Sequence, residues 1–153
     1  MKKIIIISII FIFDRASKMY LINLQETGID VDIYVFSFLN IYLLWNTGIG
    51  FGLISSEANL FYHFTSFIIL LINIFLIYLL YKLKNIQSYM IALILGGSLG
   101  NLFDRMYYYA VPDFIDFHIE EFHWFVFNVG DIFITLGIFG LLFVELFGRK
   151  MKG

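Results

Sequence analysis

Four long apolar segments constrain this 153-residue chain more than any other feature of its sequence. They cover about residues 4–22, 60–81, 88–107 and 129–147. Each is close to the ~20 residues that an α-helix needs to cross the hydrocarbon core of a bilayer. Only 14% of the residues are charged, whereas a soluble domain has about a quarter. The pattern predicts an all-α membrane protein with four transmembrane helices, folded as one integral membrane domain over residues 1–153.

The first apolar segment has a second interpretation. Lys2 and Lys3 precede the apolar run Ile4–Phe13, which is also the pattern of a cleavable signal peptide. However, the apolar run resumes after Asp14–Lys18, and no small-x-small cleavage pattern follows it. We therefore expect an uncleaved helix that crosses the membrane.

The basic residues predict the orientation of the chain. Seven of the ten Lys and Arg residues lie at the start, in the short second connection and at the end: Lys2, Lys3, Lys82, Lys84, Arg149, Lys150 and Lys152. The two remaining connections, about 23–59 and 108–128, contain acids but no Lys or Arg. Because basic residues are enriched in cytoplasmic segments, we expect both termini to be cytoplasmic and both long connections to lie outside.

The two outer connections contain strand-like sequence. Residues 30–45 and 114–127 alternate between apolar and polar residues and are rich in β-branched and aromatic side chains. The glycine-rich segment Asn46–Gly52 follows the first of them and reads as a turn. We expect one or two short strands in the first connection to pair with the second. The result would be a small extracytoplasmic β-sheet over the mouth of the helix bundle.

Several polar residues fall within the predicted helices. Asp14 and Lys18 are four residues apart, so they share one helix face and can form an ion pair. Asn101, Asp104 and Arg105 lie near the outer end of the third apolar segment. Buried ion pairs that fix helix packing account for Arg15, Lys18 and Arg105. For Asp14 and Asn101, packing and substrate contact both remain open.

Asp113 and Asp131 stand at the predicted outer membrane surface. Asp131 opens the fourth apolar segment, where a helix N-terminus favours negative charge, and Asn128 can cap that helix. Taken singly, Asp131 could be a first-turn acid and Asp113 a turn residue. Taken together they predict a pair of carboxylates. Two carboxylates held close together cannot both ionise easily, which separates them into an acid and a base.

Other kinds of site find little support. The chain has no cysteine, and His63, His118 and His123 do not have the spacing of a zinc-binding helix. No serine stands in a nucleophile-elbow pattern. The few basic residues lie mainly at the cytoplasmic edges, which argues against nucleic-acid binding. We therefore expect no metal, no organic cofactor and no nucleic-acid partner.

Five sequence motifs, in this order, resemble those of the lipoprotein signal peptidase (signal peptidase II) family, which are membrane aspartic endopeptidases of bacteria. They are Asp14–Lys18, Asn46–Gly52, Gly96–Arg105, Asp113–Asp116 and Phe127–Asp131. Each is weak alone, but their order on a four-span topology is specific. This chain departs from the family pattern at Ile49, Gly50, Pro112 and Gly130, none of which removes a reactive group.

The resemblance implies both a reaction and a site. Family members cut the signal peptide from a diacylglyceryl-modified prolipoprotein, immediately before the lipidated cysteine. It also implies that Asp113 and Asp131 are catalytic, and that eight further residues bind substrate or brace the site: Asp14, Lys18, Asn46, Gly48, Asn101, Asp104, Arg105 and Asn128. The outer strands would form a cradle over the bundle. We expect a monomer in the bacterial cytoplasmic (inner) membrane, in contact with membrane lipid and with its active site on the outer face.

Two other functions compete with this interpretation. A small proton- or ion-coupled transporter would use intramembrane Asp and Arg residues as a relay. Such a relay needs ionisable groups near the midplane of several helices, and here only Asp14 lies deep. A catalytically inactive adaptor that binds lipoproteins is the other alternative. Because both aspartates are present, the sequence gives no reason to prefer it.

Overall fold

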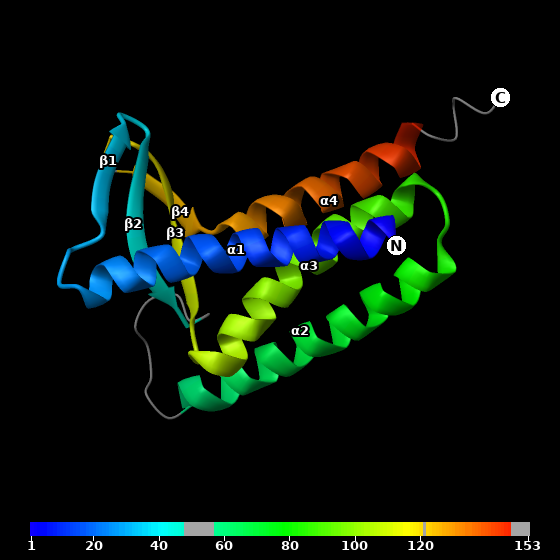
Figure 1. Ribbon diagram of the computed structural model, residues 1–153, viewed down its shortest axis with the longest axis horizontal. Helices are drawn as coiled ribbons and strands as arrows, with labels where there is room; N and C mark the ends of the chain where they lie inside the picture. Colours follow the sequence, from blue (N-terminus) through cyan, green and yellow to red (C-terminus); the bar gives the residue numbers. More distant parts are fainter. Residues whose placement is uncertain (48–56, 121, 148–153) are drawn as a thin grey trace.

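The computed structural model describes residues 1–47, 57–120 and 122–147. Within these ranges the chain forms four helices and four strands (Figure 1). The helices are α1 (Lys2–Glu26), α2 (Glu57–Lys82), α3 (Ile86–Tyr107) and α4 (Val129–Phe147). The strands are β1 (Asp32–Phe36), β2 (Leu39–Asn46), β3 (Val111–Ile119) and β4 (Phe122–Phe127). All four predicted helices are present, and the strands fall inside the two predicted outer connections.

Three helices among the described residues are long and apolar enough to cross a membrane: Tyr62–Lys82 of α2, Ile86–Tyr107 of α3 and Val129–Phe147 of α4. Three of the four predicted spans are therefore candidate membrane spans by length and composition. Helix α1 is long enough at 25 residues, but Asp14, Arg15 and Lys18 interrupt its apolar sequence. Whether α1 crosses the membrane stays a prediction.

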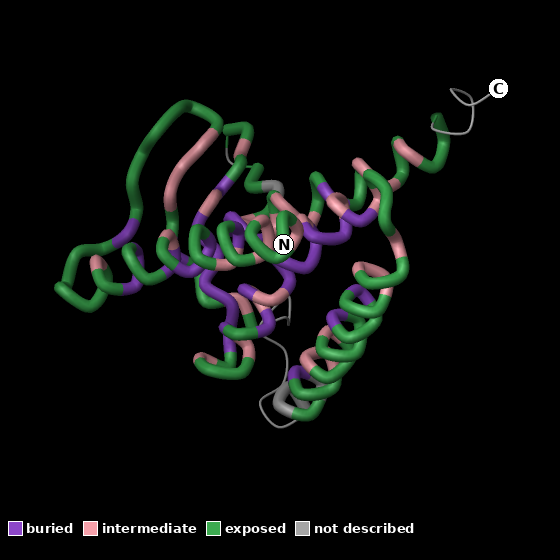
Figure 2. The backbone as a smooth tube through the Cα atoms, turned by 45° about the vertical axis from the view of Figure 1, so that its right-hand side comes forward, coloured by how far each residue is buried: buried purple, intermediate pink, exposed green. Residues whose placement is uncertain are grey.

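Helix α3 lies at the centre of the bundle and contacts α1, α2 and α4. Half of its span is buried inside the protein, against 11% for α2 and 17% for α4. Figure 2 shows the same contrast, with buried residues gathered where α1, α3 and the sheet meet. The outward faces of α2 and α4 are apolar and exposed, as lipid-facing helices require.

Small residues on α3 permit this close packing. A Cβ atom added at Gly97 would overlap the Gly130 carbonyl oxygen of α4, and one at Gly100 would overlap the Asp14 carboxylate of α1. Without side chains at these two positions, the backbones approach closely enough for polar groups on the three helices to meet.

The four strands form one antiparallel sheet in the order β1-β2-β3-β4, placed at one end of the bundle (Figure 1). The predicted strand pairing between the two outer connections is confirmed, since β2 pairs with β3. A cluster of buried apolar residues fastens the sheet to α1 and α4. It consists of Leu21, Ile22, Val31, Leu43, Phe114 and Val129.

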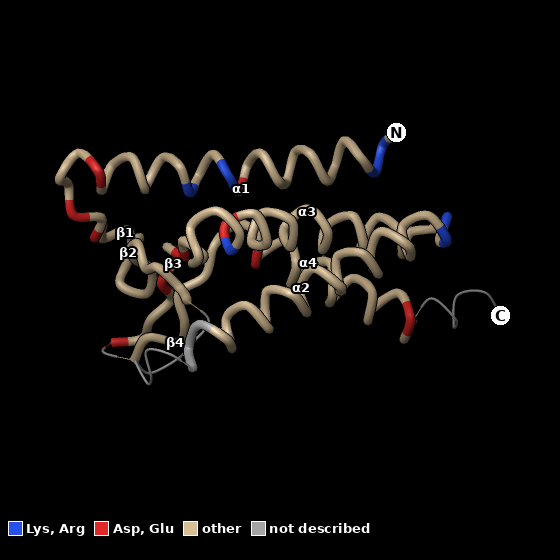
Figure 3. Tube along the Cα trace, turned by 90° about the horizontal axis from the view of Figure 1, so that it is seen from below, with Lys and Arg blue, Asp and Glu red and all other residues tan. Residues whose placement is uncertain are grey.

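Charge is distributed unevenly along the molecule (Figure 3). Lys2 and Lys3 lie at the end opposite the sheet, and Lys3 Nζ donates hydrogen bonds to the carbonyl oxygens of Leu80 and Leu83, at 3.4 and 3.1 Å. This contact joins the start of α1 to the end of α2. The basic residues at 149, 150 and 152 lie outside the described residues. The orientation across the membrane stays a prediction that this distribution supports.

Candidate active site

Asp113 lies on β3, where the sheet meets the helices, and only 3% of its surface is exposed. Two amide groups donate hydrogen bonds to its carboxylate. Asn46 Nδ2, from the end of β2, lies 2.8 Å from Oδ2, and Asn128 Nδ2 lies 2.6 Å from Oδ1. Both donors are neutral. The buried carboxylate therefore has no cation in direct contact among the described residues.

Asp131 occupies the first turn of α4, where the helix N-terminus favours a negative charge. Its Oδ1 accepts a hydrogen bond from Asn101 Nδ2 at 2.8 Å, and its Oδ2 accepts one from the Asn128 backbone N–H at 3.1 Å. In return, the Asp131 backbone N–H donates to Asn128 Oδ1 at 3.0 Å. This reciprocal arrangement caps the helix, as the sequence predicted for Asn128.

Asn128 connects the two aspartates. Because the Asp131 N–H occupies its amide oxygen, its amide nitrogen is directed at Asp113. The side chain is fully buried, so both contacts are made away from solvent. Asn128, which lies between β4 and α4, thus donates to both predicted carboxylates, to Asp113 through its side chain and to Asp131 through its backbone N–H.

Burial changes the acidity of Asp113. Loss of water around its carboxylate raises the pKa from 3.8 to about 6, and the nearby charge of Asp131 acts in the same direction. Hydrogen bonds from Asn46 and Asn128 oppose the change but do not cancel it. A carboxyl with this pKa can hold or release a proton near neutral pH, as general acid–base chemistry requires.

A second cluster of charges lies next to this site, between α1 and α3. Lys18 Nζ donates three hydrogen bonds of 2.7 Å, to Asp14 Oδ2, Asp104 Oδ2 and Asn101 Oδ1. Arg15 pairs with the other oxygen of Asp104. Asp14, Lys18 and Asp104 have no exposed surface. Here two acids face two cations, and the cluster is neutral as a whole. The predicted pair of Asp14 and Lys18 is confirmed.

The two clusters are joined at two points. Lys18 holds the oxygen of Asn101, which leaves the amide nitrogen of Asn101 to face Asp131. The backbone N–H of Gly130 donates to Asp14 Oδ1 at 2.7 Å, which fixes the residue immediately before Asp131. The charge cluster thus positions Asp131 without touching it.

The structure gathers six of the eight predicted bracing residues around the aspartates: Asp14, Lys18, Asn46, Asn101, Asp104 and Asn128. Gly48 lies outside the described residues. For Arg105, the prediction of an acidic partner is wrong within the described part of the chain. Its guanidinium lies 5.4 Å from the Tyr62 ring centre, and Tyr62 donates a hydrogen bond to its backbone carbonyl. The two oxygens of Asp104 are occupied by Arg15 and Lys18 instead.

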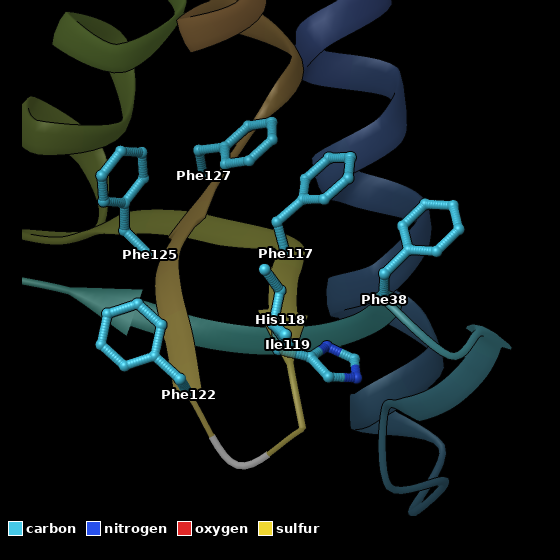
Figure 4. Close-up of a pocket in the computed structure, with 7 residues that line it drawn as sticks. All are labelled: Phe38, Phe117, His118, Ile119, Phe122, Phe125 and Phe127. Carbon is cyan, nitrogen blue, oxygen red and sulfur yellow. The ribbon is translucent and has the colours of Figure 1, made fainter.

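Sequence reasoning did not find the cavities beside the site. One of about 320 Å³ contains Asp131 and is otherwise lined by Phe125, Phe127, Ile132, Thr135 and Leu136. A larger one of about 510 Å³ shares two of these phenylalanines (Figure 4). It is lined by Phe38, Phe117, His118, Ile119, Phe122, Phe125 and Phe127. The aromatic residues on the strands are visible in the sequence, but their spacing does not show which rings line the same cavity.

Comparison with known proteins identifies the chemistry that such a site serves. The family model described as signal peptidase (SPase) II matches residues 6–147. The chain belongs to the signal peptidase II family. It is therefore a protease of a bacterial membrane, and the aspartic type is consistent with the family. This outcome sets aside the transporter interpretation.

Individual relatives agree over nearly the whole chain. A lipoprotein signal peptidase of Pelagibacter ubique is 52% identical over 149 residues, covering 97% of this chain and 90% of the relative. One from Anaplasma phagocytophilum is 40% identical over 151 residues, covering 96% and 93%. A solved structure of a bacterial membrane enzyme has 29% identity and a TM-score of 0.73, covering 95% of this chain and 92% of that one.

Proposed function

We propose that Asp113 and Asp131 are the catalytic pair with which this enzyme cuts a diacylglyceryl-modified prolipoprotein immediately before its lipidated cysteine. Family membership assigns the removal of signal peptides from prolipoproteins. The observation that carries the choice of residues is the bridge through Asn128, whose side-chain amide donates to the Asp113 carboxylate and whose backbone N–H donates to the Asp131 carboxylate. Asn46, Asn101 and Asn128 act as positioning residues, because each fixes one or both carboxylates through a hydrogen bond.

In the proposed mechanism the pair shares one proton. The ionised carboxylate takes a proton from a water molecule, and the resulting hydroxide attacks the scissile carbonyl carbon. The protonated carboxyl polarises the carbonyl oxygen and gives its proton as the C–N bond breaks and the amine leaves. Because the two groups titrate together, the roles of acid and base belong to the pair and not to a fixed member.

The cavity beside Asp131 supports access from the lipid. Its wall is formed by residues of β4 and the first two turns of α4, and these are mainly apolar. A signal peptide is itself apolar, so it can approach Asp131 within the bilayer while the acyl chains stay among lipid. Since both carboxylates and their donors come from one chain, we propose that the monomer is the active form.

We propose further that α1 is the fourth span. Its 25 residues extend about 37 Å at 1.5 Å per residue, enough for the ~30 Å hydrocarbon core. Its central charges are almost fully buried against α3, so lipid does not meet them. This topology puts both termini in the cytoplasm and Asp113 and Asp131 at the outer face of the cytoplasmic membrane.

The proposal is tested with purified protein in detergent and two versions of one precursor, with and without the diacylglyceryl group. Wild type should cleave only the diacylated form, and Asp131→Asn should cleave neither. Equal cleavage of both precursors would refute the lipid requirement. Substantial cleavage by Asp131→Asn would refute the aspartate pair.

A further inference from the structure

We infer that Asp116, His118 and His123 form a binding site for a divalent transition-metal ion such as Zn²⁺. The three residues lie on the β3–β4 hairpin. This site therefore differs from a zinc-binding helix, whose histidine spacing the sequence lacks. Asp116 and His118 are two residues apart on β3, so they point to the same face of the strand. Asp113 is three residues before Asp116 and points to the opposite face. The metal site is therefore separate from the catalytic pair.

A β-bulge brings the third residue to this site. Phe117 pairs with Phe125, but the next residue, His118, pairs with His123, so β4 contains one extra residue between these two pairs. Such a bulge reverses which face the following side chains occupy. His123 thus lies directly across from His118, and the two imidazole rings stack with their centres 5.2 Å apart.

The distances suit a single ion. Asp116 Oδ2 lies 2.8 Å from His123 Nδ1 and 3.6 Å from His118 Nδ1. One donor atom from each of the three residues lies within 4.8 Å of the others. In a tetrahedral zinc site with bonds of ~2.0–2.1 Å, donor atoms are roughly 3.3 Å apart. The separations of 2.8 and 3.6 Å lie on either side of that value, so small side-chain rotations allow all three atoms to reach one ion.

A plain hydrogen bond between Asp116 and His123 does not account for the whole cluster. Asp116 Oδ1 and His118 Nδ1 are buried and make no hydrogen bond within the described part of the chain. Asp116 is only 3% exposed. Buried polar atoms left without a partner are costly, and a bound ion would satisfy the histidine nitrogen and complete the environment of the carboxylate.

The donor set fits zinc-like ions. Two neutral imidazoles and one carboxylate are the protein ligands of several three-ligand zinc sites, in which water fills the fourth position. The His123 side chain is 57% exposed, which gives an ion access from solvent. A bound ion would link β3 to β4, the strands that lead to Asp113 and Asn128. Its role would be to brace the hairpin, outside the reaction itself.

The experiment uses tag-free protein in detergent, depleted of metal with a chelator and then dialysed. Zn²⁺ binding is measured by calorimetry, and Co²⁺ is used as a second probe because its visible absorption reports nitrogen and oxygen ligation. We expect one ion per chain and a melting temperature that rises with Zn²⁺ concentration. His118→Gln, His123→Gln and Asp116→Asn should each weaken binding by about tenfold or more.

His63→Gln is the matched control, because His63 lies on α2 against Tyr62 and Tyr109 rather than in the hairpin. It should bind Zn²⁺ like wild type. His123→Gln decides the test if a more buried variant does not fold, since His123 is mostly exposed. Absence of saturable one-to-one binding below millimolar Zn²⁺ would overturn the inference. Binding that His123→Gln leaves intact, or that His63→Gln weakens equally, would also overturn it.

Discussion

Two groups of buried aspartates lie side by side in this protein and are treated in opposite ways. Asp14 and Asp104 face Arg15 and Lys18, and their charges are balanced by cations. Asp113 and Asp131 receive hydrogen bonds from amides and from a backbone N–H instead. The same chemical group is neutralised in one place and left unneutralised a few ångströms away.

On the proposed function, the difference separates acids that hold the helices together from acids that react. A cation next to a carboxylate favours its ionised form and so opposes the effect of burial. A buried carboxylate that has only neutral donors keeps a raised pKa, as Asp113 does, and can serve as acid or base. Burial alone would not have distinguished the two groups, since Asp104 is at least as buried as Asp113. The partners of each acid do.

The largest expected effect comes from removing either reactive charge. Asp113→Asn and Asp131→Asn should each lower the rate of precursor cleavage by about 10²-fold or more, because acid–base help alone supplies ~10²–10⁴-fold. Both variants should insert and fold like wild type, with no loss of thermal stability. Asp104→Asn is the matched comparison from the balanced cluster. It should lower the melting temperature and affect cleavage far less. The reverse pattern, an inactive Asp104→Asn with normal stability, would break the comparison.

The next largest effect is on stability. Lys18→Met removes the cation whose three hydrogen bonds join Asp14, Asp104 and Asn101. Breaking a buried ion cluster from one side leaves charge uncompensated and costs about 3–5 kcal/mol. We expect a large fall in the melting temperature in detergent. A variant that melts like wild type would show that the cluster does not stabilise the packing of α1 on α3.

A smaller effect is expected from pH. The pKa of Asp113 in the folded protein, about 6, lies above its ordinary value of 3.8. The folded state therefore binds this proton more tightly than the unfolded state, and the associated stability is lost as pH rises from about 4 to 6. At ~1.4 kcal/mol per pKa unit, Asp113 contributes a loss of about 3 kcal/mol.

Thermal melts of wild type and Asp113→Asn across pH 4 to 8 measure this contribution by difference. The difference in melting temperature, Asp113→Asn minus wild type, should be larger at pH 7 than at pH 4. Parallel curves for the two proteins would contradict the raised pKa, because the other acids are common to both.

Much of this arrangement could be predicted from the sequence. Apolar length predicted α2, α3 and α4, because the bilayer sets the length of a helix that crosses it. Alternation predicted strands in both outer connections. The spacing of Asp14 and Lys18 predicted their pairing, since helix geometry alone brings positions four apart together. These are local relations, and each is readable over a few residues.

Relations between distant segments were harder to predict. Nothing local indicates that Asn128 directs its amide at Asp113, because that depends on the Asp131 N–H occupying its oxygen. The grouping of His118 and His123 depends on a β-bulge that sequence spacing does not reveal. Asp104 illustrates the same point. Its cationic partners, Arg15 and Lys18, come from a different helix, whereas its neighbour in sequence, Arg105, has no acidic partner among the described residues.

The smallest expected effect concerns that neighbour. Arg105→Met should destabilise the protein much less than Lys18→Met, because the Arg105 guanidinium lies over the Tyr62 ring and not against a described acid. A cation–π contact of this kind is worth about 0.5–2 kcal/mol. Melting temperatures of the two methionine variants, compared under one set of conditions, test the ranking. If Arg105→Met is the more damaging, then Arg105 supports the fold through contacts other than this ring. The cluster of Lys18 with Asp14 and Asp104 would then not be the main charged group that stabilises the helices.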